Sequence, residues 1–565
     1  MPNFLTNQNS WMDGKRPVYL LTLDWGGEVF RFSTIPIALT NTSLSAAEND
    51  VLQFRGGLEN PDFEERANRQ GVSTGGVSIP FTVYLPDDVD VATEIQKRVP
   101  LSAATGELSM IIIDEKHRHT TPTYDFNNRF LLARGICQMP VYAHVGQPNR
   151  LDFSLESILP DSDSTPLVSP TKSITVKTWP SAPDTSKGRV YPTVIGTPGY
   201  YFQGNPEAGP VVTYCQGVPA YKVTDNTGSD VKLLIAGHDV VADSVRVFSE
   251  NNTTGTAFDV EHITDGLGQL ISFVQLAGNA LQNDSSFHVS WSGGGLPNPF
   301  GPSALRGMGD VMLWALQSAG TGGLDLPKWE NERENLNKIA IDCYINDNRI
   351  TGWEFVRNNL LDLLALEIRE GVRGIFPRVR LWGITANDCQ KINEGPDFYP
   401  IGPMTTQTDF GDIRNDISIR YAYCATDGYR QSSVISDLVS GQTVSSAAIQ
   451  TDVDLSMFSS SYAFISAQRY GTRSESINSR VLWEDASAAL AISERCRNLG
   501  FTQSSRPYEA DVTYGWLDVG DYISLESDTL GTANGFSMAE ITGKKWNGFA
   551  WEFLLTFDDD PLLRS

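Results

Sequence analysis

Cysteine and histidine are scarce in this sequence, with six of each among 565 residues. The smallest interval between two cysteines is 35 positions, from Cys389 to Cys424. Zinc ribbons, iron–sulfur clusters and thiol-exchange motifs use closely spaced cysteines, and no CxxC pair is present. We therefore predict reduced thiols that lie mostly in hydrophobic cores: Cys137, Cys215, Cys343, Cys389, Cys424 and Cys496.

Long hydrophobic runs and an excess of basic charge are also missing. No stretch of about 18 apolar residues, as a membrane-spanning helix requires, occurs in the chain, and residues 1–16 lack the apolar core of a secretory signal. With 43 Lys and Arg against 68 Asp and Glu, the net charge is −25. This charge opposes binding to nucleic acid phosphates or anionic membranes. We therefore expect a protein that is made in a cytoplasm and has no membrane span.

The remaining composition is that of a globular, turn-rich protein. Hydrophobic residues make up 40% of the chain and glycines number 49, a balance typical of folded and β-rich proteins. A chain of 565 residues exceeds the size of a single hydrophobic core. The expected fold class is mostly β with an α+β insert. The expected segments are a strand-rich domain at 1–158, a Pro-rich crossing at 159–210, a β-rich domain at 211–300, an α+β domain at 301–383 and a C-terminal β domain at 384–565.

Apolar residues alternate along the N-terminal segment as they do in β-strands. YLLTLDW (19–25) and EVFRFST (28–34) flank two glycines, which predicts a hairpin with a tight turn, because glycine readily adopts positive φ angles. An apolar stripe with a spacing of four residues predicts one short helix at 90–99. Further strands are expected at 77–85, 107–113, 129–138 and 149–158.

From residue 301 onward the apolar period changes from two to nearly four, which predicts helices. We expect one helix after Asp310 as N-cap and a longer one that continues to Gly371. Thr351 and Glu354 can form a capping box at the start of the longer helix. Two facing strands are expected to follow, at 372–376 and 378–382.

The last segment returns to strand-like patterns around one helix. The helix is expected at 485–499, with Asp485 as its cap and Gly500 as its end. Strands are expected at 416–424, 462–471, 519–527 and 549–557.

Two of the six histidines, His117 and His119, lie two positions apart after a run of isoleucines. On a strand they would face the same side, and Asp114 or Glu115 could add an oxygen ligand to a metal ion. No further histidine or cysteine lies nearby, so we interpret the segment as a solvated loop after a strand. The remaining histidines are scattered singly, and no Ser/His/Asp triad can be chosen from the sequence: His144, His238, His262 and His288.

Other candidate motifs also favour structural roles. GMGDVM (307–312) lacks the glycine pattern and the lysine of a phosphate loop, and SWSGGG (290–295) is interpreted as an interdomain loop. Asp558–Asp560 have no calcium-loop spacing, and Trp546 and Trp551 alternate with apolar residues as in a packed sheet. The sequence therefore predicts no enzyme and no catalytic, cofactor-binding or metal-binding residue.

The second half of the chain resembles the baseplate hub, or tail-tip, proteins of long-tailed (siphovirus-type) bacteriophages and gene transfer agents. The resemblance is greatest over 300–560, and GRVYPTVIGTPGYYF (188–202) resembles a connection that the family has upstream. The matching landmarks, in family order, are GDVMLWALQSAGTGG, ENERENLNKI, AIDCYIND, RITGWEFVRNNLLDLLALEI, NDISIRYAY, RYGTRSESINSRVLWEDASAALAISERC, LDVGDYISLE and GKKWNGFAWEFLLTF.

The resemblance implies a structural virion protein of the tail baseplate. Such hubs are homotrimers that join the hexameric tail tube to the tail tip or fibres and line the DNA exit channel. Residues 1–158 and 384–565 would form tail-tube-like β-barrels with flanking helices, two per chain, in a pseudo-sixfold ring. Implied partners are a distal tail or tail tube protein above, tail-tip, fibre or spike proteins below, and the tape measure protein. DNA would pass without specific binding, which suits an acidic channel wall.

Two other functions fit an acidic, β-rich, multidomain chain. One is a tail-associated glycoside hydrolase or depolymerase, which would require a cleft with two carboxylates about 5–9.5 Å apart and aromatic walls. The other is a carbohydrate-binding adhesin. Neither explains the order of the landmarks in the helical segment.

Overall fold

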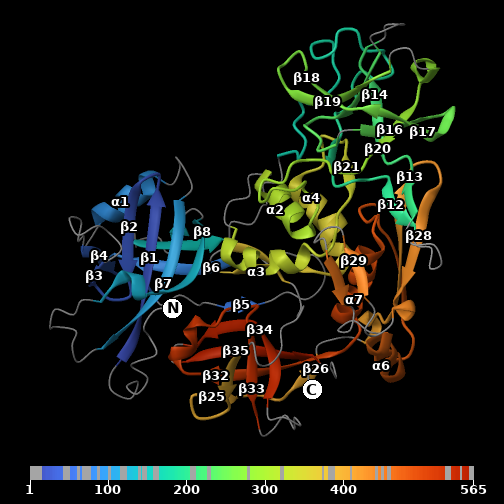
Figure 1. Ribbon diagram of the computed structural model, residues 1–565. Helices are drawn as coiled ribbons and strands as arrows, with labels where there is room; N and C mark the ends of the chain where they lie inside the picture. Colours follow the sequence, from blue (N-terminus) through green and yellow to red (C-terminus); the bar gives the residue numbers. More distant parts are fainter. Residues whose placement is uncertain are drawn as a thin grey trace.

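In the computed structural model, curled β-sheets from the two ends of the chain lie beside a helical layer, from which a further β-rich unit projects (Figure 1). Strands account for 46% of the structure and helices for 21%, so the expected fold class, mostly β with an α+β insert, is confirmed. No helix in the described part is long and apolar enough to cross a bilayer. The structure describes residues 15–41, 51–59, 64–66, 78–85, 89–98, 104–114, 124–137, 141–142, 149–156, 165–203, 211–224, 231–242, 244–276, 280–318, 324–371, 374–378, 389–406, 410–438, 443–446, 451–454, 460–527, 536–547 and 550–558.

The N-terminal sheet is built on the predicted hairpin of β1 (Lys15–Trp25) and β2 (Glu28–Ser33). The two turn glycines have φ angles of +64° and +102°, as the tight turn requires. A bridge between Leu58, which follows β4, and Val83 of β6 links opposite sides of the sheet, so that the sheet is strongly curled. The other elements are β3 (Ile37–Thr40), β4 (Val51–Gly56), β6 (Ser78–Tyr84), α1 (Val89–Arg98), β7 (Ala104–Asp114), η4 (Phe126–Asn128), β8 (Phe130–Cys137), β9 (Val141–Tyr142) and β10 (Arg150–Glu156).

The projecting unit, called the upper unit below, contains a seven-stranded sheet in the order β17-β16-β20-β14-β15-β19-β18. Trp179 and Tyr191, from the segment before it, pack with Leu234 and Ile271 of the sheet. Its elements are β14 (Val218–Lys222), β15 (Lys232–Ala236), β16 (Ser244–Ser249), β17 (Asn252–Asp259), β18 (Glu261–Thr264), β19 (Leu270–Gln275), η5 (Ala280–Asn283) and β20 (Phe287–Ser290). It is connected to the rest through β11 (Thr193–Ile195), which pairs with β21 (Cys343–Ile345), and through the hairpin of β12 (Tyr200–Gln203) and β13 (Val211–Tyr214).

The helical layer differs from the expectation at two helix ends. Asp310 lies in the first turn of α2 (Met308–Ser318), so its predicted role as N-cap is wrong. The capping box of Thr351 and Glu354 is confirmed, but the helix ends at residue 364 and not at 371. Ala365 has a φ of +52°, which turns the chain into a hairpin. The layer comprises α2, α3 (Leu326–Leu336), α4 (Gly352–Phe355), the π-helical η6 (Val356–Leu361), α5 (Asp362–Leu364), β22 (Glu367–Gly371) and β23 (Gly374–Arg378).

The facing strands therefore lie several residues before their expected positions of 372–376 and 378–382. β22 takes residues that the helical pattern had included, and β23 ends at Arg378. Residues 379–382 lie outside the described ranges. A helix end set by a left-handed alanine has no glycine to signal it in the sequence.

A small sheet of β27 (Asp416–Cys424), β28 (Gly428–Val434) and β31 (Ser474–Asn478) packs against α7 (Asp485–Leu499). Glu484, not Asp485, occupies the N-cap position of α7. The strand predicted at 462–471 is wrong: these residues lie in α6 (Ser460–Tyr470). Ala463 and Ser466 are buried whereas Phe464 is 62% exposed, which is a helical pattern of burial. Also present are η7 (Phe410–Asp412), η8 (Ile435–Asp437), β29 (Thr443–Ser446) and β30 (Thr451–Asp454).

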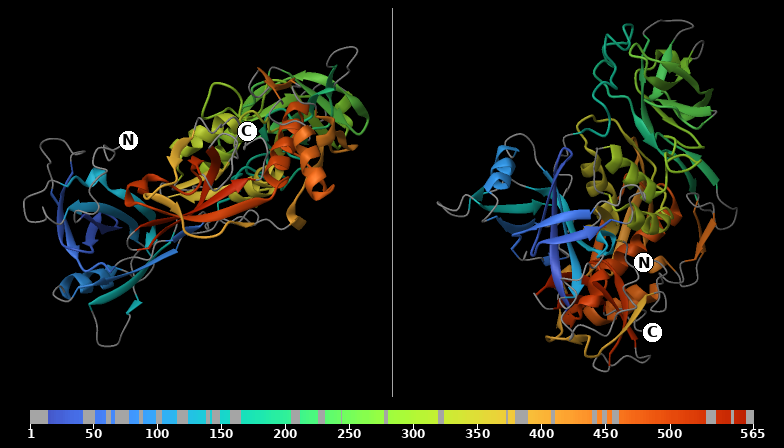
Figure 2. Two further views of the ribbon diagram at one scale, coloured as in Figure 1. Left: turned by 90° about the horizontal axis from the view of Figure 1, so that it is seen from below. Right: turned by 90° about the vertical axis from the view of Figure 1, so that its left-hand side faces the viewer.

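The C-terminal sheet has the order β24-β33-β34-β35-β32-β25 and contains the strands expected at 519–527 and 549–557. A short N-terminal strand, β5 (Glu64–Arg66), pairs with Gly543 to Lys545 of β34. Buried side chains of both curled sheets belong to one hydrophobic cluster, and the sheets lie side by side (Figure 2). The elements are β24 (Gln390–Asn393), β25 (Phe398–Pro400), β26 (Thr405–Thr406), β32 (Gln503–Ala510), η10 (Val512–Trp516), β33 (Tyr522–Glu526), β34 (Phe536–Trp546) and β35 (Trp551–Asp558).

Candidate functional sites and assembly surfaces

The histidines considered as metal ligands, His117 and His119, lie outside the described residues, as do Glu115 and His144. Asp114 is the last residue of β7. Across the described ranges, no group of three or more His, Cys, Asp and Glu side chains is arranged to hold a metal ion. The interpretation of the segment after β7 as a loop stays a prediction.

A histidine, a serine and an aspartate do meet in the upper unit, where β18 pairs with β19. His262 Nδ1 lies 3.2 Å from Asp239 Oδ1 and 3.0 Å from Ser272 Oγ. In a catalytic triad the acid and the nucleophile contact different ring nitrogens. Ser272 is also fully buried, and its hydroxyl donates to the carbonyl oxygen of His238 at 2.8 Å. The three side chains therefore tie a loop to a strand and do not form a triad.

His238 is a neutral structural side chain. Its Nε2 accepts a hydrogen bond from Val194 N at 2.9 Å, and its Nδ1 lies 2.7 Å from the carbonyl oxygen of Asp239. Burial lowers the pKa of His238 to about 4. Burial also lowers the pKa of His288. Neither side chain provides an exposed base.

The glycine-rich segment 307–312 is a packed helix start. Asp310 N donates to Asn337 Oδ1 at 2.9 Å, and the Asp310 carboxylate accepts from Asn298 Nδ2 at 2.7 Å. Arg333 Nε lies 3.3 Å from the same carboxylate. A Cβ on Gly307 would lie only 2.4 Å from Asn337 Oδ1. This glycine therefore permits close packing against the end of α3, which supports the structural interpretation of the motif.

The SWSGGG segment is a tight turn between units. Trp291 Nε1 donates to the carbonyl oxygen of Gly294 at 2.8 Å. Gly293 has a φ of +107°, and a Cβ there would lie 2.4 Å from the carbonyl oxygen of Val241. Ser290 is fully buried. These contacts support a structural role for the segment as a turn.

One pair of carboxyl groups lies at the contact of α3 with α7. Burial, and then the charge of Glu494, raise the pKa of Glu332 to about 7, against the opposing effect of Lys328. Glu494 is fully buried. A glycosidase needs both of its carboxyl groups in contact with the sugar. A polysaccharide cannot reach Glu494, so this pair does not support the hydrolase alternative.

The two tryptophans near the C-terminus lie in the core of the C-terminal sheet. Trp546 and Trp551 form an edge-to-face pair with ring centroids 4.9 Å apart, and both are buried. Lys544 lies 4.8 Å from the Trp551 ring and donates to the Gly515 carbonyl at 2.8 Å and Asp518 at 3.0 Å. A buried aromatic pair offers no sugar-stacking face. Of the acids in the predicted C-terminal cluster, Asp558 ends β35, and Asp559 and Asp560 lie outside the described residues.

A buried ionic network, which sequence patterns did not predict, joins distant segments beneath the upper unit. Arg306 contacts Asp342 Oδ1 at 2.8 Å, Asp342 Oδ2 at 3.0 Å and Glu484 Oε1 at 2.8 Å. Thr197 N donates to Asp342 at 2.7 Å, and Ser487 Oγ to Glu484 at 3.2 Å. Burial acts to lower the pKa of Arg306, but the two carboxylates outweigh it and raise the pKa. The network connects four segments that are up to 290 positions apart in the sequence.

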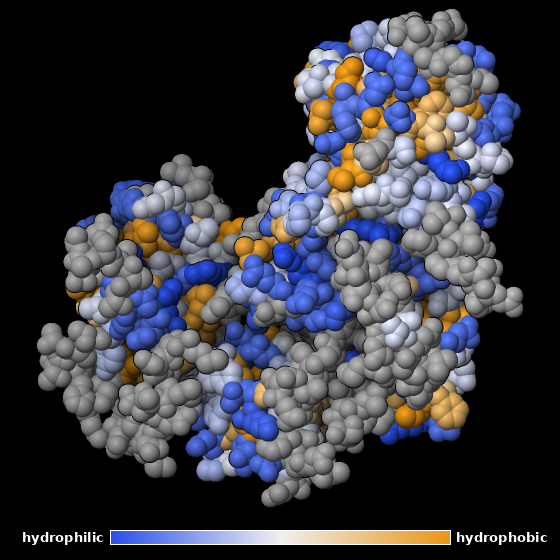
Figure 3. Space-filling view, viewed as in Figure 1, coloured by the Kyte–Doolittle hydropathy of each residue, from blue (hydrophilic) through white to orange (hydrophobic). Residues whose placement is uncertain are grey.

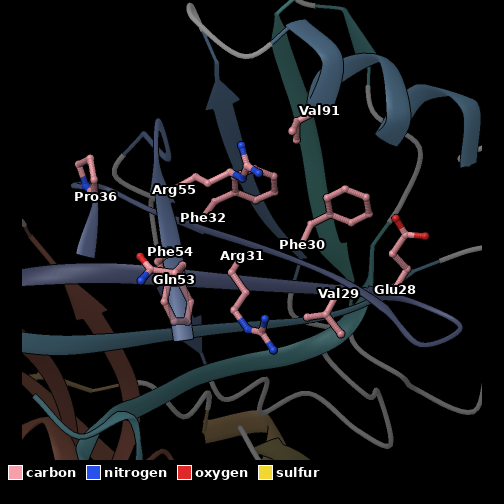
Figure 4. Close-up of a pocket in the computed structure, with 10 residues that line it drawn as sticks. All are labelled: Glu28, Val29, Phe30, Arg31, Phe32, Pro36, Gln53, Phe54, Arg55 and Val91. Carbon is pink, nitrogen blue, oxygen red and sulfur yellow. The ribbon is translucent and has the colours of Figure 1, made fainter. Parts of the chain in front are cut away.

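A pocket of about 530 Å³ opens between β2, β4 and α1 (Figure 4). β2 and β4 run parallel and pair only at Phe32 with Arg55 and Ser33 with Gly56, so the two strands diverge from that point. The pocket is lined by aromatic side chains from both strands and by two arginines: Glu28, Val29, Phe30, Arg31, Phe32, Pro36, Gln53, Phe54, Arg55 and Val91. Only one acid is present, so the pocket lacks the carboxylate pair of a glycosidase.

The surface is mostly polar, with hydrophobic side chains in small groups (Figure 3). At the outer end of the upper unit, Val176 is 64% exposed, Leu267 54% and Leu270 46%. The segment that contains Val176 is joined to the one that contains Leu267 by a hydrogen bond of 3.2 Å, from Gly266 N to the Thr178 carbonyl oxygen. Along the β25–β26 edge of the C-terminal sheet, Tyr399, Ile401 and Met404 are exposed. Such groups are typical of surfaces that meet other proteins.

Comparison with known proteins gives weak likenesses only. No family model matches the chain, and no curated protein matches it. Among solved structures, a tail protein from Neisseria meningitidis MC58 aligns at 8% identity over 97% of this chain and 98% of its own, with a TM-score of 0.36. A 43 kDa tail protein of prophage MuSo2 from Shewanella oneidensis aligns at 8% identity over 97% and 100%, with a TM-score of 0.35.

A Francisella PdpA–VgrG complex aligns at 8% identity over 96% of this chain and 53% of that one, with a TM-score of 0.29. TM-scores below 0.5 do not establish a common fold. We therefore assign neither fold nor function from these three alignments.

Proposed function

We propose that this chain is a structural protein of a bacteriophage tail, and specifically a homotrimeric baseplate hub that joins the hexameric tail tube to the tail tip or fibres. The supporting observation is the pair of curled β-sheets from opposite ends of one chain, joined by β5 on β34 and by a shared hydrophobic cluster. Three chains supply six such sheets, the number that a sixfold tube requires at its end. The protein is then a virion component, placed at the tail baseplate.

In a closed ring, the N-terminal sheet of one chain must also contact the C-terminal sheet of the next. Among the described residues, the face formed by β2, β4 and α1 lies on the side of the N-terminal sheet away from the C-terminal sheet of its own chain, which suits it to that contact (Figure 1). Two arginines, Arg31 and Arg55, line the pocket on this face against one acid, Glu28, so its lining is net positive in a chain of net charge −25. A second copy, which is acidic, is therefore the occupant that we propose for the pocket.

The other partners follow from the arrangement of the units. The ring of curled sheets would meet a distal tail or tail tube protein, with the tape measure protein inside. The upper unit projects away from these sheets and would meet tail-tip, fibre or spike proteins, for which Val176, Leu267 and Leu270 provide exposed apolar surface. DNA would pass through the ring, and acidic side chains on its wall would prevent adhesion.

The first test is the mass of the purified protein, measured by light scattering on a sizing column. Three chains of 62.1 kDa give 186.3 kDa, and electron micrographs of that species are expected to show a ring with threefold symmetry. A protein that stays monomeric at all concentrations and is absent from isolated tails would contradict the proposal. Cleavage of host polysaccharide by the monomer would favour the depolymerase alternative, and specific binding on a glycan array would favour the adhesin.

A charge reversal tests the ring contact itself. Arg31→Glu combined with Arg55→Glu is expected to convert the trimer to monomer, because it opposes two acidic surfaces. Arg349→Glu is the matched control, since Arg349 is 87% exposed and lies in the helical layer, away from this face. Unchanged circular dichroism would show that the double variant is folded. A trimer that survives the double reversal would place the contact elsewhere.

A further inference from the structure

Two of the six cysteines meet between hairpins that are distant in the sequence. Cys215 follows β13, and Cys424 is the last residue of β27, 209 positions later. The β12–β13 hairpin lies beside β28, the partner strand of β27 (Figure 1). Both residues belong to one buried cluster, with exposures of 3% and 0%, and each thiol affects the ionisation of the other. A search for closely spaced cysteines could not find this pair.

Backbone hydrogen bonds next to both cysteines hold the sulfurs together. Ala425 N donates to the carbonyl oxygen of Gln216 at 3.4 Å, and Cys215 N donates to that of Gly199 at 2.8 Å. A Cβ on Gly199 would lie 2.6 Å from the Cys215 carbonyl oxygen, so the two backbone segments are in close contact. Disulfides form between cysteines whose Cα atoms are about 4.4–6.8 Å apart. Because Gln216 and Ala425 are hydrogen-bonded neighbours of the two cysteines, the two side chains are brought close to each other, as a disulfide requires.

The surroundings of the two sulfurs shift the pKa values of the two thiols in opposite directions. The hydrogen bond from Cys215, and further the guanidinium of Arg430, lower the pKa of Cys424 to about 4, whereas burial opposes the shift. The same hydrogen bond, and then burial, raise the pKa of Cys215. Thr426 Oγ1 lies 3.5 Å from Cys424 Sγ, and Asp427 forms an ion pair with Arg430. Of the two sulfurs, Cys424 is therefore the one whose ionisation the surroundings favour, and the thiolate is the nucleophilic form.

We propose that Cys215 and Cys424 form an oxidisable pair, which a hydroperoxide converts to a disulfide that joins β13 to β27. The Cys424 thiolate attacks one peroxide oxygen, the O–O bond breaks, hydroxide leaves, and a sulfenic acid forms. The Cys215 sulfur then attacks Cys424 Sγ, the S–O bond breaks, and the Cys215 proton passes to the departing hydroxide, which leaves as water; the first hydroxide takes up the proton that Cys424 lost on ionisation. Overall, two thiols and one hydrogen peroxide give one disulfide and two waters. Two electrons pass from the sulfurs to the peroxide.

Hydrogen peroxide suits this site better than a larger disulfide oxidant, because both sulfurs are buried. Of the groups around them, the Arg430 side chain is 30% exposed and that of Asp427 54% exposed. A small neutral oxidant needs only a brief movement of these two side chains to enter. The product closes a loop of 209 residues and makes the contact between the upper unit's hairpin and the β27 sheet covalent.

The test uses the wild-type protein. It is treated with hydrogen peroxide, capped with iodoacetamide under denaturing conditions, digested without reduction and mapped by mass spectrometry. The expected product is one linked pair of peptides, with Cys215 in one and Cys424 in the other, whose mass is two hydrogens below the sum. Dithiothreitol should restore both thiols.

Cys389 is the internal comparison, because it is half-buried and contacts Met538 Sδ at 3.5 Å. Cys389→Ser should retain the linked peptides. Cys215→Ser should instead leave Cys424 as a sulfenic or sulfinic acid. The proposal is overturned if Cys215 and Cys424 are both still alkylated after a dose that oxidises Cys389. It is equally overturned if Cys424 is oxidised in the wild type while Cys215 remains a free thiol.

Discussion

The network of Arg306 with Asp342 and Glu484 predicts a large and local effect of a single substitution. Arg306→Met removes a cation that contacts both carboxylates, and Asp342 is 0% and Glu484 8% exposed. Breaking a buried ion pair by removing one partner costs roughly 3–5 kcal/mol. Thr197 and Ser487 still donate to the carboxylates. We therefore expect a loss near the lower limit, about 3 kcal/mol.

Native-state hydrogen exchange measures this loss where it occurs. Asp342 N donates to the Val481 carbonyl at 2.8 Å, and Ala340 N donates to Ser487 Oγ at 2.8 Å. A local loss of about 3 kcal/mol speeds the exchange of these two amides on the order of 100-fold. Unchanged exchange relative to wild type would refute the electrostatic account of the junction.

Two controls separate charge from packing. Arg349→Met, at an exposed ion pair with Asp347, should change nothing measurable. Adding Asp342→Asn and Glu484→Gln to Arg306→Met should recover most of the loss, because no buried charge is then left unpaired.

Three further substitutions test local features. Glu332→Gln should flatten the pH dependence of the melting temperature. The Glu332 carboxyl has a native pKa of about 7 and an unfolded pKa near 4.5, so its contribution to the stability of the native state is complete below pH 4.5. This contribution, up to about 3 kcal/mol, is lost as the pH rises through 7. Thr351→Ala, but not Thr351→Ser, should cost about 1 kcal/mol in denaturant unfolding, because the box with Glu354 is lost. Gly57 has a φ of +114°, and a Cβ there would lie 2.1 Å from the Tyr84 carbonyl oxygen. Gly57→Ala should therefore lower the free energy of unfolding by roughly 2 kcal/mol or more and expose the N-terminal sheet to protease. Gly26→Ala, where a Cβ meets no atom within 4 Å, should lower it by less.

Local sequence signals predicted the elements whose causes lie within a few residues. The hairpin of β1 and β2 follows from two turn glycines between alternating strands, and the capping box at Thr351 and Glu354 joins groups three residues apart. The strands β27 and β35 and the helix α7 were also predicted within a few residues of their ends. Each of these patterns is complete in one short window of the chain.

The errors occurred where distant contacts decided the outcome. Residues 462–471 have alternating apolar residues, yet they form α6, because Asn415 and the Gly500 carbonyl both hydrogen-bond the Ser466 hydroxyl and bury one helical face. The helix predicted to reach Gly371 stops at Leu364, since its following residues pair as the β22–β23 hairpin. Periodicity describes one element at a time and cannot show what covers it.

The amino-acid sequence by itself determined that the protein is mostly β with a helical insert, strongly acidic and without closely spaced cysteines. Only the tertiary structure decided that β5 joins a strand almost 480 positions away, that Arg306 lies between two acids, and that Cys215 and Cys424 lie in one buried cluster. The physical reason is the range of the interactions. Turn geometry, capping and amphipathic spacing act between near neighbours, whereas strand addition, buried charge pairing and thiol contact depend on which segments the collapsed core brings together.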